Sequence, residues 1–508
     1  MVKTSDLNKL NKKLLIGFII LQPILQLVLS VFDDEGFAIG GISVATMVRY
    51  ALIGTITVLA VIANFKRKCT RLFLCYMGLS GIFAVVQYLN VRDFDEIIYG
   101  ISMNKGIVQV VLYLSRYIIP MIVLYGVYVL KFDYKDIKIA VLPAVLFVSL
   151  SIIVTNLLGV DYISYAYGSN DHPTASILSW FTTDMTKADW RALTSRGLYL
   201  SGNELSSLFV VLLPVTAYIG LKEKKHLFMV PVFLQMLAMI MLGTKVSVYG
   251  SVLLFTATVL IWLFDSLFNK KKIKLTKVIS IVLTFAIFGL ILYNSPFYGR
   301  ITQGEGGNAV YEDVGDTNVS PPDDGSLSTE DALQKKIKYI KENYMLHSIP
   351  AVVIYEVYSF RLHPDFWINL MNNVEFSERN NARKIKTLVL EDIMVNKGDV
   401  LDGLVGMGEV PVYPEKDFTS QYYYLGAVGM VLFILPYIMI LLFAVFTFLR
   451  RLIKRRFKPL ATVLTMSLGF ILVIALYAGH VFEPIYINTF VAMAAGTLTL
   501  YAAKEKEE

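Results

Sequence analysis

Long apolar runs recur along this chain, separated by short polar segments. The windows 15–31, 141–154 and 278–293 carry almost no charge, and an α-helix needs about 20 apolar residues to cross a bilayer. Taken in order, the runs predict about twelve spans, at 14–32, 42–64, 72–90, 105–130, 138–158, 201–221, 226–244, 246–267, 278–294, 421–448, 459–480 and 483–502. We therefore expect an all-α integral membrane protein with about twelve transmembrane helices.

One long and mostly polar block, residues 294–419, interrupts this pattern. It divides the chain into a membrane bundle of nine spans at 1–293, a loop domain at 294–419 and three further spans at 420–508. The block contains aromatic residues and helical patterns, so it is too rich in structure-forming residues to be a tether. We expect one large folded loop domain attached to the bundle.

The loop domain has recognisable parts. Residues 303–327 are rich in Gly, Asp, Asn, Ser and Pro, which predicts a mobile acidic strip. Helical patterns at 328–344 and 381–395 flank an aromatic segment at 352–376. We expect that segment to lie on the membrane interface or to cap the bundle.

Charged residues in the short loops indicate the orientation of the chain, because Lys and Arg collect on the cytoplasmic side. Alternate loops are basic, around residues 66–71, 131–138, 222–225, 270–277 and 450–458, whereas the loops at 33–35 and 93–96 are acidic. This predicts a plasma-membrane protein with both termini in the cytoplasm and the loop domain outside. The formal charge of +7 follows from these loops, so nothing in the charge indicates nucleic-acid binding.

Several charged residues fall at or inside the predicted spans, where charge is costly and usually functional. Arg196 precedes the sixth span, and Asn203 and Glu204 follow it one to two helical turns later. Lys245 lies in a tight turn between spans seven and eight, and Arg116 lies near the middle of the fourth span. Arg196 and Lys245 could instead anchor the chain at lipid headgroups, and Arg116 could pair with Glu204 rather than bind a lipid phosphate.

Further candidates lie in and after the loop domain. Arg379 precedes its second helical pattern, and a Gly-x-x-Gly-x-Gly run at 403–408 allows close backbone approach. Glu415 and Asp417 then lead into the tenth span, and His480 lies in the last predicted external turn. The two acids could also be an ordinary acidic span boundary.

The order of these motifs resembles the O-antigen ligase and polysaccharide polymerase superfamily, in its Gram-positive branch. The resemblance covers residues 194–484. It rests on Arg-Gly-x-x-x-x-x-Asn-Glu at 196–204, Gly-Thr-Lys at 243–245, Ser-x-Arg at 377–379, Gly-x-x-Gly-x-Gly at 403–408, Glu-x-Asp-Phe at 415–418, Gly-x-x-Gly at 426–429 and Gly-His at 479–480.

The resemblance implies a GT-C-like glycosyltransferase bundle of twelve spans with an external lid. It also implies metal-independent sugar transfer from an undecaprenyl-pyrophosphate donor, without a cofactor, to a growing glycan acceptor. The ligase branch typically has a histidine at the position of Glu415, so this chain departs from a histidine base. Membrane lipids would be the remaining partners.

The chemistry of such a transfer suits the candidate residues. Fixed guanidinium groups stabilise the charge that grows on a leaving pyrophosphate, which favours Arg196 and Arg379, with Lys245 and Arg116 behind them. A carboxylate can accept the proton of the acceptor hydroxyl, which favours Glu415 and then Asp417. Asn203, Glu204 and His480 would complete the substrate-binding set, and no His/Cys/Asp cluster has metal-ligand spacing.

Other functions remain open at this point. A ligase that transfers a lipid-linked glycan to another cell-envelope acceptor would use the same residues as a polymerase. A lipid-oligosaccharide flippase would also have about twelve spans and buried arginines, but it would not need the loop domain. A cell-wall synthase of the shape-and-division type also couples a bundle to an external acidic loop. Neither of the last two accounts for the ordered motifs from Arg196 to His480. Between polymerase and ligase we favour the polymerase, because the resemblance is to the Gram-positive branch, in which no lipid A core exists to accept a ligated chain.

Overall fold

The computed structural model describes residues 4–32, 38–39, 42–92, 97–98, 101–102, 105–165, 171–303, 329–343, 358–375, 378 and 381–503. The acidic loops at 33–35 and 93–96 lie outside these residues. So do Arg379, the acidic strip apart from Gln303, and most of the aromatic segment before Tyr358.

Most described residues are helical, and ten of the described helices are long and apolar enough to cross a membrane. They are α1 (Thr4–Phe32), α2 (Val44–Asn64), α3 (Lys68–Val91), α4 (Ile107–Val129), α5 (Tyr134–Leu158), α6 (Gly202–Lys222), α8 (Lys245–Phe268), α9 (Leu275–Tyr293), α17 (Leu435–Ile453) and α18 (Pro459–Tyr477). The prediction of an all-α membrane protein is confirmed.

Two further predicted spans are occupied by shorter helices. The span at 226–244 consists of the 3-10 turn η3 (His226–Met229) followed by α7 (Val230–Leu242), and the last span is α19 (Ile485–Ala503). The predicted span 421–448 is divided between α16 (Asp417–Phe433) and α17, which meet at Ile434, and Gly426 within α16 departs from helical geometry with φ 64° and ψ −178°. The exact number of twelve spans stays a prediction.

The chain divides into two compact units. Unit 1 comprises Met1–Tyr76, Arg116–Gly307 and Leu435–Glu508, and unit 2 comprises Met77–Ser115 and Asn308–Ile434. Helices α3 and α4 therefore each contribute residues to both units. Each unit also has an antiparallel hairpin whose strands are two residues long. In unit 1, β1 (Ala38–Ile39) pairs with β2 (Ile42–Ser43), and in unit 2, β3 (Ile97–Ile98) pairs with β4 (Ile101–Ser102).

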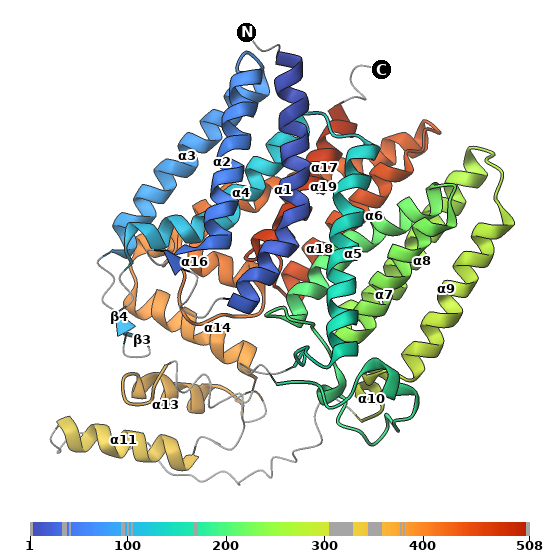
Figure 1. The fold of residues 1–508 in the computed structure, drawn as a ribbon. Helices are drawn as coiled ribbons and strands as arrows, with labels where there is room; N and C mark the ends of the chain where they lie inside the picture. Colours follow the sequence, from blue (N-terminus) through green and yellow to red (C-terminus); the bar gives the residue numbers. More distant parts are fainter. Residues whose placement is uncertain are drawn as a thin grey trace. The chain divides into compact units, whose positions relative to one another are not determined.

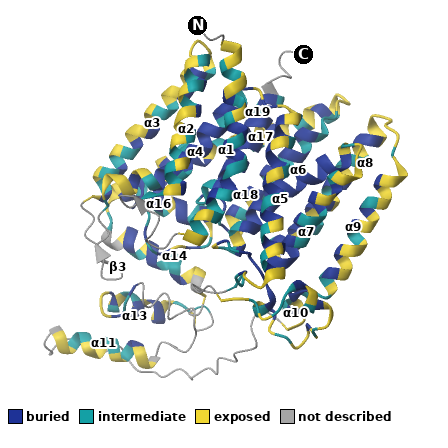
Figure 2. Cartoon of the chain, in the orientation of Figure 1, coloured by how far each residue is buried: buried dark blue, intermediate teal, exposed yellow. Residues whose placement is uncertain are grey.

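Helix α6 is the centre of unit 1. It contacts α5, α7, α8, α18 and α19 (Figure 1), and every residue from 205 to 221 is buried. Figure 2 shows buried residues along α6 and α18, whereas α9 has an exposed face that includes Val282, Leu283 and Leu290. A helix that is apolar all round belongs inside a bundle, and the exposed apolar face of α9 suits contact with lipid.

The basic loops gather at one end of unit 1, where Figure 1 also places both chain termini. Tyr501 in α19 lies within range of the charge of Asp133. Further contacts join these loops to one another or to neighbouring helices. They link Lys12 with Asp136, Arg67 with the Val129 carbonyl, Lys138 with Glu223, Lys277 with the Gly220 carbonyl, and Arg451 with the Tyr501 carbonyl. One end of the bundle is thus basic, as the positive-inside pattern requires.

Unit 2 contains several short helices and a buried aromatic cluster. The helices are α11 (Thr329–Asn343), α13 (Pro364–Asn373), α14 (Ala382–Asp392), the π-helical turn η5 (Ile393–Lys397), α15 (Val400–Val405) and α16. Tyr358, Phe360 and Trp367 are buried, and the Trp367 indole donates to the Tyr358 carbonyl at 2.7 Å. Helices α11 and α14 occupy the two stretches with helical patterns, whereas α13 was not expected.

Two backbone segments of unit 2 cross in contact at the glycine motifs. The Met407 and Gly408 amides donate to the Tyr423 and Tyr424 carbonyls at 2.9 and 3.1 Å. Gly406 has φ 79°, and a methyl group there would lie 2.2 Å from the Tyr424 carbonyl oxygen. The glycine run therefore has a structural reason: only glycine lets these backbones approach so closely.

The loop between α5 and α6 contains the 3-10 turns η1 (Ile177–Phe181) and η2 (Arg191–Leu193). Lys187 in this loop and Lys272 between α8 and α9 are both exposed. Since the loop order alternates from one side of the bilayer to the other, these two lysines should lie on opposite faces.

The first prediction concerns that topology. In a Cys69→Ser, Cys75→Ser background in intact cells, Lys187→Cys should react with a membrane-impermeant thiol reagent and Lys272→Cys should be protected. After membrane permeabilisation both should react, which controls for intrinsic reactivity. Labelling of only Lys272→Cys in intact cells would invert the orientation.

The second prediction concerns the backbone crossing. Gly406→Ala adds a clash and a strained positive φ, so we expect unfolding to become easier by about 2–4 kcal/mol. Gly403→Ala is the control, because a methyl group there meets nothing within 4 Å and alanine favours helix by up to about 1 kcal/mol. Thermal unfolding of both purified variants in detergent measures the difference, and equal stability would refute the proposed role of Gly406.

Candidate functional site

The candidate residues are distributed over both units. Arg116, Arg196, Asn203, Glu204, Lys245 and His480 belong to unit 1, whereas Glu415 and Asp417 belong to unit 2. Arg379 lies outside the described residues.

Arg196 lies in a loop that backbone hydrogen bonds hold against the bundle. Its amide donates to the Tyr162 carbonyl, and the Tyr162 amide donates to the Gly197 carbonyl, both at 2.9 Å. The preceding Ser195 amide donates to the Met241 carbonyl at the end of α7, at 2.8 Å. Gly197 has φ 61° and packs closely on Ile152, so the loop turns sharply where Arg196 projects.

The Arg196 guanidinium is fixed and largely removed from solvent. Only 6% of the residue is exposed, Nη1 donates to the Leu200 carbonyl at 2.5 Å, and the guanidinium carbon lies 5.8 Å from the centre of the Tyr162 ring. Burial lowers the pKa of Arg196, and Tyr162 partly opposes this shift. Arginine remains a cation even so, and reduced solvation strengthens its attraction for an anion.

The turn before Lys245 contacts the Arg196 loop. Gly243 ends α7 with φ 64°, and a methyl group there would lie 2.5 Å from the Thr194 side chain. Thr244 caps α8 by accepting from the Ser247 amide at 3.0 Å, and its hydroxyl bonds Ser206 of α6 at 2.6 Å. Lys245 is exposed at the first residue of α8, where the helix dipole also favours an anion.

Arg300 joins this region and was not among the sequence candidates. It lies in α10 (Pro296–Gln303), and Nη1 donates to the Tyr165 hydroxyl and to the Gly243 carbonyl, the latter at 3.1 Å. Its guanidinium lies 5.1 and 5.0 Å from the rings of Tyr165 and Trp190. Its aromatic partners precede it by more than a hundred residues, so only the fold could associate them.

Glu204 lies in a polar cluster at the start of α6. The Tyr486 hydroxyl donates to its carboxylate at 3.2 Å, and the charges of Glu483 and Arg116 act on it. An acid in the first turn also stabilises a helix, so Glu204 has a structural role beside any role in binding. Asn203, one residue earlier, is exposed.

Arg49 is a buried arginine whose hydrogen bonds stay inside the bundle. It donates to Gln22 and Gln26 of α1 at 3.1 and 3.2 Å. A buried cation held by two neighbouring amide groups is typical of structural packing.

His480 occupies the turn between α18 and α19. It is half-buried and has φ 62°, directly after Gly479 with φ 72°. Non-glycine residues adopt this conformation at a cost of about 1–3 kcal/mol, often at functional sites. The strain makes His480 a position worth testing.

In unit 2 the Glu415 carboxylate is half-buried and forms an ion pair with Arg383 of α14. Burial lowers the pKa of Lys386, and the Glu415 charge partly opposes this shift, so a second cation lies nearby. Asp417 is buried at the first residue of α16, where a carboxylate stabilises the helix start. Glu415 is thus the more accessible of the two acids.

Within the described ranges, no group of three or more His, Cys, Asp or Glu residues is arranged to hold a metal ion. Such an arrangement would be needed for a metal centre built from these side chains.

Comparison with known proteins identifies the family. A family model described as O-antigen ligase like membrane protein matches residues 8–505, nearly the whole chain. The chain belongs to this family, which confirms the resemblance seen in its motifs. No curated protein and no solved structure matches the chain significantly. Membership indicates a multi-pass membrane protein of the glycosyltransferase type that transfers glycans.

Proposed function

We propose that this protein polymerises oligosaccharide repeats carried on undecaprenyl pyrophosphate, at the external face of the plasma membrane. The main support is the contact between the Arg196 loop, the Gly243 turn and Arg300. This contact brings together the segments that carry Arg196, Lys245 and Arg300, at the end of unit 1 where α6 and α8 begin. In this family, such a cluster suits a lipid-linked pyrophosphate.

The donor is bound by charge in this proposal. Arg196 offers a planar guanidinium that can contact two phosphate oxygens at once, and Lys245 adds a cation at a helix start. Arg379 is assigned to the same task by its motif, and Arg116 is a further candidate for it. Asn203, Glu204 and His480 position the sugar portion.

The transfer itself is one displacement. The acceptor hydroxyl oxygen attacks the anomeric carbon of the donor sugar, and the bond from that carbon to the pyrophosphate oxygen breaks. The pyrophosphate leaves with the bonding electrons, and the arginines stabilise its added charge. The proton of the attacking hydroxyl passes to Glu415, with Asp417 as the second candidate.

Glu415 must exchange its ion-pair partner to act as the base. The pair with Arg383 involves side chains that are 31% and 55% exposed, so breaking it costs only about 0.2–1 kcal/mol. An acceptor sugar could therefore displace Arg383 at little cost. No metal or cofactor enters this proposed mechanism, because arginine and lysine supply the charge stabilisation.

A ligase would carry out the same displacement with another cell-envelope acceptor. The polymerase is favoured because the motifs resemble the Gram-positive branch, in which no lipid A core exists to accept a ligated chain.

The third prediction tests donor binding. Arg196→Lys keeps the charge but loses the planar fork, so polymer formation should fall about 10- to 100-fold. Single lipid-linked repeats should accumulate on the outer leaflet, where added glycosidase cleaves them in intact cells. Arg191→Lys, in the same loop but exposed, is the control and should resemble wild type. Normal polymer would reject the assignment of Arg196, and repeats protected from the glycosidase would indicate a flippase.

The fourth prediction tests whether the Glu415 carboxylate is needed as a base or only as the ion-pair partner of Arg383. Glu415→Gln should abolish polymer while lowering stability by less than about 1 kcal/mol, because an exposed pair contributes little. Arg383→Gln breaks the same ion pair but keeps the carboxylate, so it should retain polymer. Polymer analysis and thermal unfolding of both variants give the answer. Equal loss of polymer in the two variants would show that the pair matters rather than the base.

A further inference from the structure

A hollow lies at the opposite end of unit 1 from Glu204, between α17, α18 and α19. Tyr486, which bonds Glu204, is near the start of α19, and Tyr501, which lines the hollow, is near its end. Fifteen helical residues separate them, or about 22 Å at 1.5 Å per residue. The hollow is therefore distinct from the proposed donor site and lies at the end that carries the basic loops.

The turn after α17 builds one wall of this hollow. The Arg456 amide donates to the Arg451 carbonyl at 2.8 Å, and the Arg455 amide donates to the Leu452 carbonyl at 3.0 Å. With Arg455 at φ 54°, this is the Schellman arrangement that reverses the chain at a helix end. It folds Arg456 and Lys458 back beside Arg451, and all three line the hollow.

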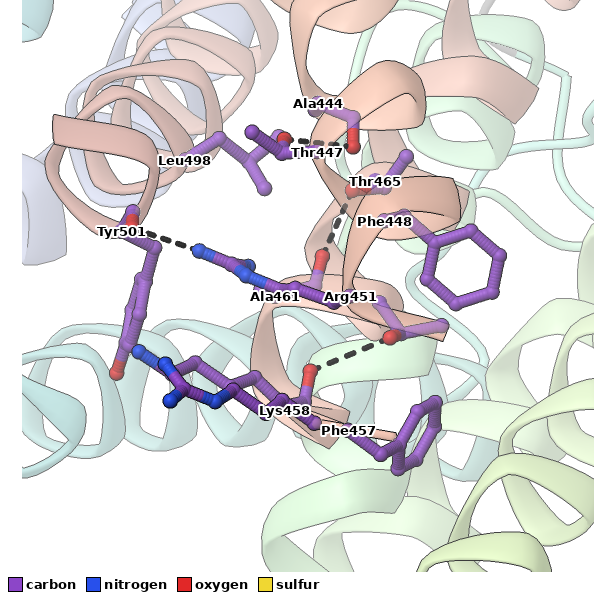
Figure 3. Close-up of a pocket in the computed structure, with 12 residues that line it drawn as sticks. Ala444, Thr447, Phe448, Arg451, Phe457, Lys458, Ala461, Thr465, Leu498 and Tyr501 are labelled. Carbon is purple, nitrogen blue, oxygen red and sulfur yellow. Dashed lines mark hydrogen bonds between the residues drawn. The ribbon is translucent and has the colours of Figure 1, made fainter. Parts of the chain in front are cut away.

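The hollow is positively charged. Arg451 is only 6% exposed, and its Nη2 donates to the Tyr501 carbonyl at 2.8 Å (Figure 3). None of the 12 lining residues is acidic. Because like charges repel more strongly as solvent is removed, an anion between these cations would stabilise the arrangement. Thr447, Thr462 and Thr465 also line the hollow. Each hydroxyl donates to a backbone carbonyl three or four residues earlier, so its oxygen can only accept a hydrogen bond from a ligand.

The surroundings of the hollow are apolar. Phe448 and Phe457 lie on the side of Arg451 away from Tyr501 (Figure 3), and the Phe457 ring packs edge-on against Phe264 of α8 at 4.9 Å. Phe446, Leu449 and Ile453 are exposed along α17. A soluble anion would gain nothing from this apolar face, whereas acyl chains would cover it.

We propose that this hollow binds the phosphate headgroup of an acidic phospholipid at the basic end of the bundle. Arg451, Arg456 and Lys458 contact the phosphate oxygens, and the threonine oxygens accept from hydroxyl groups of the headgroup. The acyl chains lie along the exposed face of α17. Basic pockets between transmembrane helices on the cytoplasmic side are suited to such headgroups. This binding does not depend on the proposed glycan transfer.

The fifth prediction tests this site with the full-length protein. Phosphatidylglycerol is titrated into protein held in phosphatidylcholine nanodiscs, and bound lipid is counted by native mass spectrometry. The test variant is Arg456→Gln with Lys458→Gln, which leaves the buried Arg451 in place. The control variant is Lys454→Gln with Arg455→Gly, which removes two charges from the same loop at positions that do not line the hollow.

The test variant should lose affinity for phosphatidylglycerol by about tenfold or more, since each cation near a membrane surface contributes substantially to anionic lipid binding. The control should bind like wild type, and inorganic phosphate should not compete. Equal loss in both variants would reduce the effect to overall loop charge and overturn the proposal. Unchanged binding in the test variant would also overturn it, and so would competition by inorganic phosphate, which would indicate a site for soluble anions.

Discussion

The cost of removing charge from water governs how this protein uses its arginines and lysines. A cation in or near a bilayer is stable only with a hydrogen-bond partner or access to a polar region. Some here are neutralised by carboxylates, as in the pairs Lys12–Asp136 and Lys138–Glu223. Others bond backbone carbonyls: Arg196 to Leu200, Arg300 to Gly243 and Arg451 to Tyr501. A carbonyl satisfies the donor without cancelling the charge, so these contacts preserve the attraction for an anion.

Both ends of unit 1 contain arginines that bond backbone carbonyls. At one end, carbonyl-bonded arginines accompany the Gly243 turn, which suits a lipid-linked pyrophosphate. At the other, Arg451 accompanies further cations in a turn, which suits a phospholipid. The proposed base, Glu415, instead belongs to unit 2 and has an arginine partner. Charge that is held but not cancelled is thus the common basis of both proposed anion sites.

Sequence patterns predicted the membrane helices well, because hydropathy reports directly on burial in lipid. They indicated that the glycine run allows close backbone approach but not which segment approaches it, since the crossing of the Gly406 and Tyr424 backbones depends on contacts between distant segments. Arg300 was missed for the same cause: its partners Tyr165 and Trp190 lie far away in sequence. The Glu415–Arg383 pair was also invisible, because a charge pattern does not specify which cation folds back onto which acid. The roles of the candidate residues stay predictions.

The complete burial of α6 has a consequence for how this chain can change over time. A helix that meets lipid or water on one face can accept substitutions there with little effect, whereas α6 has no such face between residues 205 and 221. Close contacts confirm how little space surrounds it: a methyl group on Gly250 of α8 would lie 3.0 Å from Val210. Interiors packed this tightly respond to a difference of one methylene group. In related chains, changes within α6 should therefore occur together with compensating changes of volume in the helices around it.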